Sequence, residues 1–207
     1  MKKTTSVFLV LVLALSSFIF SSCSVSDAIT NAQRLQFKLG NVSGFNIAGI
    51  GIGDKKSLTD INVLDAAKIV SAFSSGKLPT SFTLNLIAKN PDDGTGGAKE
   101  NNTLIRSLGW KLLIDDVDII NGNISQPITI PGVGKETVIP IEMGFDLLQY
   151  FKGDGYDKLM SLAFAIGGKS GSSARLKLKI KPTIDTFLGP FTYPGELTVI
   201  DKEFRSK

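Results

Sequence analysis

The chain has 207 residues, a formal net charge of +4 and no histidine. Two of the positive charges, Lys2 and Lys3, lie in the leader described below, so 4 − 2 leaves +2 for the rest of the chain. This near balance does not indicate a nucleic-acid-binding protein. The lack of histidine removes the commonest general base and the commonest metal ligand, which argues against hydrolytic or metal-dependent chemistry.

Residues 1–22 have the pattern of a signal peptide. Lys2 and Lys3 precede an apolar run over residues 7–19, which is shorter than the roughly 20 apolar residues of a membrane-spanning helix. The run leads into residues 20–23 (FSSC), which resemble a bacterial lipobox with phenylalanine in place of the preferred leucine. The resemblance implies that Cys23, the only cysteine, becomes the N-terminus and carries acyl chains such as palmitate. A plain secretory signal with a cysteine near the cleavage site is the alternative.

The mature chain is predicted to consist of a tether and one domain. Residues 23–34 are mostly small and polar, and we interpret them as the lipidated N-terminus and its tether. Residues 35–207 are enough for a single domain with its own core and without disulfides. Ser24, rather than aspartate, follows the acylated cysteine, so we expect a lipid-anchored protein of the bacterial cell envelope, held at the outer membrane.

Residues 35–52 alternate between apolar and polar side chains, which predicts one bent strand or two short strands with a break at Gly40 and Gly44. Three glycines with G-x-G-x-G spacing follow over residues 49–53. A dinucleotide-binding loop requires G-x-G-x-x-G. We therefore interpret these glycines as positions of bulges or close packing.

Residues 57–75 change to a helical period. We predict an amphipathic helix near residues 60–75, with Thr59 or Asp60 as its N-cap and Gly76 at its C-terminal end. Its polar face lacks the lysines, arginines and tryptophans of helices that lie on membranes, so we expect its apolar face to pack against an edge of the β-structure. The apolar face consists of Val63, Leu64, Ala67, Val70 and Phe73.

Residues 81–143 have the pattern of a strand, a loop, a strand, a hairpin and a further strand, each with one face exposed to water. The first strand ends at Asn90, before a proline and a glycine-rich polar loop. Tight turns are predicted at Asn121-Gly122 and at Pro131-Gly132, because these residue pairs favour turn conformations. The apolar face of the second strand consists of Trp110, Leu112 and Ile114.

Asp115, Asp116 and Asp118 follow the second strand and are candidates for a calcium site or a general acid–base pair. The sequence D-D-V-D lacks the glycine and the final glutamate of a loop-type calcium site. Acidic residues are common in solvated hairpin turns, and this is the interpretation we favour. We therefore predict no catalytic residue and no metal site. A hydrolase would require two of these carboxylates to converge in a cleft.

Two apolar stretches predict helical segments within residues 145–166, and Gly153 and Gly155 separate them. A cavity between these segments and the sheets would suit an apolar ligand, whereas a filled core would exclude one. The residues expected above such a cavity are Phe145, Leu148, Phe151, Leu159 and Phe164.

A cationic stripe is predicted in the next strand, where basic residues alternate with apolar ones. Such a stripe is a candidate surface for an anionic partner, such as an envelope polysaccharide or a lipid phosphate. It lacks the interleaved aromatic residues of a nucleic-acid-binding surface. The alternative is a solvated face that protects an edge strand from aggregation. The stripe consists of Arg175, Lys177, Lys179 and Lys181.

The central stretch combines several features in a fixed order, namely Asn90-Pro91 at the end of a strand, a strand over residues 108–114, a return with Gly122, the sequence IPGVG over residues 130–134 and a strand over residues 138–141. This order resembles the late-embryogenesis-abundant type 2 family, also called the water-stress and hypersensitive-response domain. Trp110 stands where the family usually has a tyrosine. The resemblance covers residues 81–143, with closing strands expected over residues 175–200.

The resemblance implies a seven-stranded antiparallel sandwich similar to immunoglobulin and fibronectin type III domains. It also implies a protein without enzymatic activity that binds or protects other molecules under stress. We therefore expect a mainly β protein, an immunoglobulin/fibronectin III-like sandwich with one or two accessory helices, without a cofactor other than the lipid on Cys23. Its expected partners are the membrane, through the lipid, and an envelope protein or polysaccharide. A carrier or sensor of an apolar ligand is the alternative.

Overall fold

The structure is a computed structural model of the chain. It describes residues 34–53, 55, 58–91, 102–124, 126–132, 134–166, 176–186 and 189–199. Cys23 and Arg175, two residues to which the sequence assigns a role, lie outside these ranges. Within them, no helix is long and apolar enough to cross a membrane.

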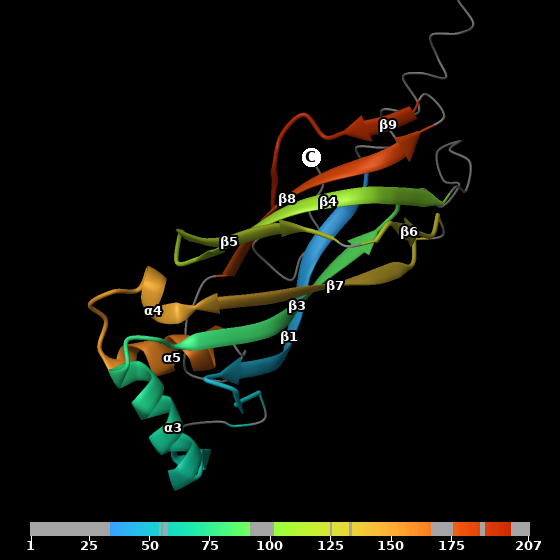
Figure 1. Cartoon of the computed structure of the whole chain (residues 1–207). Coiled ribbons are helices and arrows are strands. Elements are labelled where there is room, and N and C mark those ends of the chain that lie inside the picture. The colour runs from blue at the N-terminus through green and yellow to red at the C-terminus, as the bar shows by residue number, and fades with distance from the viewer. Residues whose placement is uncertain are drawn as a thin grey trace, which may run out of the picture.

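The described chain is mainly β, as predicted, and forms two antiparallel sheets (Figure 1). One sheet has the strand order β2-β1-β3-β7. Its strands are β1 (Gln36–Ile47), β2 (Ile50–Gly51), β3 (Pro79–Lys89) and β7 (Glu136–Asp146). The other sheet has the order β10-β8-β4-β5, with β6 beside β4 and β9 beside β8. Its strands are β4 (Thr103–Ile114), β5 (Val117–Asn123), β6 (Ile128–Ile130), β8 (Leu176–Thr186), β9 (Gly189–Thr192) and β10 (Leu197–Val199).

The first strand of the domain is one bent strand, which is one of the two arrangements predicted for this stretch. β1 pairs with β3 along most of its length, with register shifts next to Gly40 and Gly44, the two predicted break points. Gly44 has a φ of 61°, a left-handed conformation that glycine adopts without strain. The next turn, at Ala48 and Gly49, also has positive φ at both residues and leads directly into β2.

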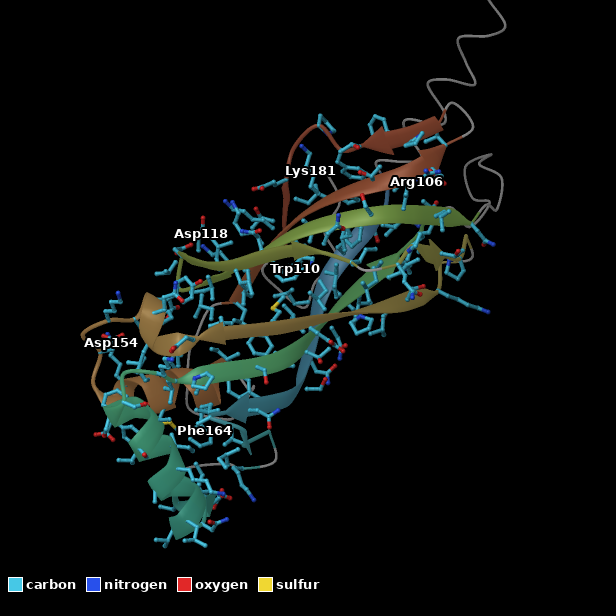
Figure 2. All side chains as sticks on the ribbon, in the orientation of Figure 1. Arg106, Trp110, Asp118, Asp154, Phe164 and Lys181 are labelled. Carbon is cyan, nitrogen blue, oxygen red and sulfur yellow. The ribbon has the colours of Figure 1, made fainter. Side chains whose placement is uncertain are left out.

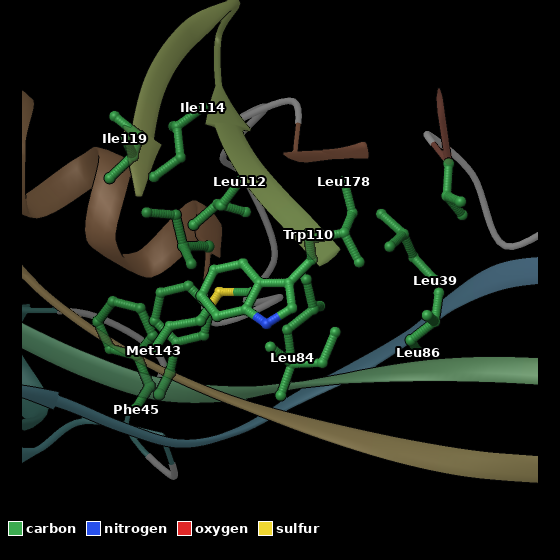
Figure 3. Close-up of a cluster of buried hydrophobic side chains, with 14 of the residues drawn as sticks. Leu39, Phe45, Leu84, Leu86, Trp110, Leu112, Ile114, Ile119, Met143 and Leu178 are labelled. Carbon is green, nitrogen blue, oxygen red and sulfur yellow. The ribbon is translucent and has the colours of Figure 1, made fainter. Parts of the chain in front are cut away.

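The two sheets face each other across one hydrophobic core. Alternate side chains of each strand point inward, because successive residues of a strand lie on opposite faces. Figure 3 shows Trp110 of β4 between the sheets, directed toward Phe45, Leu84 and Met143 of the four-stranded sheet. The face of β4 predicted to be apolar, which contains Trp110, Leu112 and Ile114, is therefore buried as expected.

The hairpin between β4 and β5 differs from the prediction. Its turn lies at Asp115 and Asp116, which have φ values of 47° and 69°, and not at Asn121-Gly122. Positive φ at both central residues is the requirement of a two-residue turn that matches the twist of a hairpin. The predicted turn was wrong because Gly122 serves a different purpose. It pairs with Trp110 inside the sheet and lies against the indole ring.

The predicted first helix is confirmed as α3 (Val63–Ser74), preceded by the short 3-10 helix η1 (Leu58–Asp60). Its N-cap is Asn62 rather than Thr59 or Asp60, because the Asn62 side chain accepts a hydrogen bond from the Asp65 N–H at 2.9 Å. Gly76 follows with a φ of 78°, in agreement with the predicted C-terminal end.

The packed side of α3 agrees with the predicted apolar face only at Phe73. Ile69 is the buried residue of the helix, and Phe73 meets Tyr156 edge-to-face with ring centroids 5.6 Å apart. Val63 and Leu64 point into solvent instead. The helical period shows that apolar side chains recur along α3, but it does not show which side of the helix packs against the rest of the protein.

The predicted helical region over residues 145–166 is confirmed for its second half. β7 continues to Asp146, and only the single turn α4 (Leu147–Tyr150) follows. α5 (Tyr156–Ile166) is a longer helix whose inner side belongs to the core. Figure 1 shows α3, α4 and α5 gathered at one end of the sheets, with α3 outermost. The buried residues of α5 are Leu159, Met160, Ala163, Phe164 and Ile166.

Candidate functional site

The cationic stripe lies on the outer face of the six-stranded sheet. β8 runs between β4 and β10, and its register places Lys177 opposite Leu113 and Lys179 opposite Lys111. Lys181 follows on the same face, and Figure 2 shows it near β8, apart from Asp118 of the β4–β5 hairpin. The structure therefore confirms that three of the four predicted cations share one face of one strand.

The acids and cations singled out in the sequence meet on this face. The Lys177 ammonium donates a hydrogen bond to the Asp116 carboxylate. Lys111 lies 3.8 Å from a carboxylate oxygen of Asp118 on the neighbouring strand. Lys179 lies 3.9 Å from a carboxylate oxygen of Glu196, the residue before β10. Ion pairs therefore link neighbouring strands across this face. The paired carboxylates make its positive potential weaker than the same lysines would give without partners.

Two of the three aspartates, Asp116 and Asp118, take part in separate ion pairs. Asp115 and Asp116 occupy the hairpin turn, and Asp118 points outward from β5. Asp116 and Asp118 are each directed toward a different lysine rather than toward each other. In the part of the chain that the structure describes, no group of three or more metal-ligating side chains comes together. Exposed ion pairs of this kind contribute about 0–1 kcal/mol each, so their main chemical effect is to balance charge.

A further ion pair on this sheet was not singled out in the sequence. Arg106 of β4 donates two hydrogen bonds, of 2.7 and 2.9 Å, to the two carboxylate oxygens of Asp185 on β8. The hydrogen bond lowers the pKa of Asp185 and raises the pKa of Arg106. Residues 79 positions apart are brought together only by the pairing of β4 with β8, so no local sequence signal indicates this contact.

A buried tyrosine follows β9. Tyr193 is fully buried, its N–H donates to the carbonyl of Pro182, and its ring lies 6.1 Å from that of Phe191. Burial raises the pKa of the Tyr193 phenol well above its usual range, because the ionised form would lose its hydration.

This burial predicts a loss of stability in alkali. Below a pH of about 10 the phenol is protonated in both the folded and the unfolded chain and adds no pH dependence. Above that pH the unfolded chain releases the proton and the folded chain retains it, so the free energy of unfolding falls as the pH rises. The free energy of unfolding, measured with urea at pH 8 and at pH 11, should fall less between these two pH values for Tyr193→Phe than for the unaltered protein. An equal fall in the two proteins would contradict the raised pKa of Tyr193.

Two open hollows lie beside α3, away from the charged face. One, of about 720 Å³, has a mainly apolar lining that includes Ala48, Leu64, Ala67, Ala72 and Pro79. The other, of about 490 Å³, is lined by Phe73, Lys77, Asp146, Leu148 and Lys152 among others. Of the five residues expected above a ligand cavity, Leu148 lines the second hollow, whereas Leu159 and Phe164 are buried in the core.

The outward side of α3 carries large apolar side chains that the described structure leaves uncovered. Val63 is 85% exposed, Leu64 75% and Val70 45%. Ala67 lies between them on the same side of the helix and is also exposed. Together with the adjoining 720 Å³ hollow, these four side chains make the α3 face, which is the second candidate site of the molecule.

Comparison with known proteins adds little to this geometry. No protein-family model and no curated protein sequence matches the chain. Among solved structures, a protein from Archaeoglobus fulgidus is similar over 62% of this chain and 86% of its own, with 11% sequence identity and a TM-score of 0.33. A similarity of this size carries no statement about function.

Proposed function

We propose that the protein is a non-enzymatic, lipid-anchored module of the bacterial cell envelope, held at the outer membrane, with a binding or protective role related to stress. The observation that carries the proposal is the position of Cys23. The only cysteine of the chain follows an apolar segment preceded by two lysines, and a small polar tether separates it from the described domain.

The charge arrangement supports a role without catalysis. Asp116 and Asp118, two acids that could have served a hydrolase, each face a lysine on the outer side of a sheet. General acid–base catalysis by two carboxylates needs both groups directed at one substrate position. Two acids held in separate surface ion pairs do not have that arrangement.

The proposed fold relationship is an immunoglobulin/fibronectin III-like sandwich of the late-embryogenesis-abundant type 2 kind. Two antiparallel sheets facing each other over one core support it. The Asn90 side chain, at the end of β3, is buried and donates to the Thr103 hydroxyl at the start of β4, so the first residue of the Asn-Pro pair ties two strands together. The participation of α5 in the core is a feature beyond the seven strands that the resemblance implies.

The test is the intact mass of the protein from the membrane fraction of a bacterium that produces the full chain. We expect a mass that begins at Cys23 and includes acyl chains, and we expect Cys23→Ala to lose the acyl chains and the membrane association. A cleaved protein without lipid would contradict the anchor. It would favour the second candidate, a soluble carrier or sensor of an apolar ligand, for which the hollow lined by Phe73 and Leu148 is the place to examine.

A further inference from the structure

The 490 Å³ hollow differs from the rest of the surface in the cations that line it. Lys77, which follows α3, and Lys152, which follows α4, both line the hollow and are exposed. Within the part of the chain that the structure describes, neither side chain forms an ion pair or a hydrogen bond. Many other lysines there are paired with carboxylates, namely Lys38, Lys68, Lys111, Lys158, Lys177 and Lys179. The hollow therefore holds two cations that the described chain does not neutralise.

The walls of the hollow are fixed to each other by Asp146, the acid that lines it. One oxygen of the Asp146 carboxylate accepts hydrogen bonds from the N–H of Leu78 at 2.8 Å and from the N–H of Leu148 at 3.0 Å. The N–H of Leu147 also donates to the carbonyl of Leu78 at 3.0 Å. These bonds join the segment after α3 to the start of α4, two elements that Figure 1 shows at the same end of the sheets. The hollow is therefore formed before a ligand binds.

The charges of the lining leave an excess of one positive charge. Lys77 and Lys152 against Asp146 give 2 − 1 = +1. The next acid after Lys152 along the chain, Asp154, is paired with Lys158 at 2.6 Å and does not compensate this excess. A lysine ammonium is a compact point charge on a flexible stem, so two of them at one hollow can both approach a single anionic group.

The occupant that matches this lining is an apolar molecule with one negative charge. Phe73 and Leu148 line the hollow and pack against the core, and the volume lies within the roughly 300–1,000 Å³ of small-molecule sites. A carboxylate has one negative charge at neutral pH, whereas a phosphate monoester has nearly two. We propose that the hollow binds a small alkyl carboxylate, with its chain on Phe73 and Leu148 and its carboxylate between Lys77 and Lys152. This inference rests on the second candidate function, the carrier or sensor of an apolar ligand, and not on the lipid anchor.

Photolabelling tests the ligand class. The probe is decanoic acid with a photoreactive diazirine on its chain, and the matched probe is the same chain with a hydroxyl group in place of the carboxylate. Each probe is added to the full chain in phosphatidylcholine nanodiscs, and mass spectrometry locates the label. We expect the acid to label residues 73–77 or 146–153 about fivefold more than the alcohol does, the factor expected of two exposed ion pairs. Equal labelling by the two probes, or labelling by the acid only elsewhere, would overturn the proposal.

Paired substitutions test the role of the two lysines. Lys77→Gln with Lys152→Gln should reduce labelling by the acid to the level of the alcohol, whereas Lys77→Arg with Lys152→Arg should retain it. The control, Lys135→Gln with Lys181→Gln, removes the same charge at exposed positions outside the hollow and should leave the labelling unchanged. A circular dichroism spectrum checks that each variant is folded. Labelling that survives the first pair of changes, or that falls equally in the control, would overturn the proposal.

Competition distinguishes the carboxylate from other sources of negative charge. Decanoate without the diazirine should suppress the labelling at a lower concentration than decyl phosphate, and the reverse order would assign the hollow to a phosphate and overturn the proposal. Stronger suppression by phosphatidylglycerol vesicles than by phosphatidylcholine vesicles would assign the lysines to a bilayer surface and also overturn it. The intact mass reports on the anchor separately. Acylated protein that takes up no label contradicts this inference alone, and labelled protein without acyl chains contradicts the anchor alone.

Discussion

Leu159→Ala is expected to lower the free energy of unfolding by about 2–5 kcal/mol, because the change removes a fully buried side chain and leaves a cavity in the core. Leu159 lies in α5, a helix that the sequence suggested only as an accessory to the sheets. A large effect would show that α5 and the two sheets unfold together. Urea unfolding followed by tryptophan fluorescence is suitable, because Trp110 is buried in the same core.

Leu64→Ala is the matched control for this measurement. It makes the same chemical change in a helix, but at a side chain that is 75% exposed. Such a surface substitution should change the free energy of unfolding by no more than about 0.5 kcal/mol. Similar values for the two variants would mean that α5 does not belong to the core.

Gly122→Ala is expected to lower the free energy of unfolding by about 1–3 kcal/mol, the usual effect of forcing extra atoms into a packed core. A Cβ atom at this position would lie 2.5 Å from Cζ2 and 2.9 Å from Cε2 of Trp110. The indole ring is part of the hydrophobic core and cannot move without disturbing its neighbours. The fluorescence maximum of this single tryptophan should shift to longer wavelength if the ring moves toward solvent.

Gly109→Ala provides the comparison within the same sheet. A Cβ atom there would lie 3.8 Å from the carbonyl oxygen of Lys181, which is ordinary van der Waals contact. Replacing this glycine should leave stability unchanged or raise it by a few tenths of a kcal/mol, because alanine restricts the unfolded chain more than glycine does. If both variants lost the same stability, the contact with Trp110 would not be the cause.

Predictions from local patterns succeeded where the pattern had one physical cause. The alternation over residues 81–89 and in β4 indicated strands, and both are strands with the expected face buried. Gly76 ended α3 because a left-handed residue is needed there. The helical period over residues 156–166 likewise gave a helix of about the expected length.

Predictions failed where two causes give the same sequence pattern. Asn121-Gly122 is favourable in a tight turn, but a glycine is equally required where a tryptophan ring covers the backbone. Asp115 and Asp116 adopt the positive φ values of the turn instead. Which pair makes the turn depends on the register between β4 and β5, and this register places Gly122 opposite Trp110, whose ring belongs to the core.

The candidate site shows the same division. Both the cations of β8 and the acids near the hairpin were visible in the sequence, but their mutual pairing was not. No local sequence pattern indicates that Lys111 pairs with Asp118 or that Glu196 pairs with Lys179. An ion pair between strands is specified by strand order, which local sequence does not encode.

The sequence by itself determined the targeting expectation, the β-rich composition of the domain and the approximate positions of its strands and two main helices, because these depend on residues close together in the chain. The tertiary structure decided which faces are buried. In α3, Ile69 is buried and Leu64 is exposed. The side of the helix that packs depends on the surfaces of α5 and of the sheet ends, which the helical period does not describe. Charge pairing, the Gly122 contact and the exposed α3 face all follow from residues that meet only after the chain has folded.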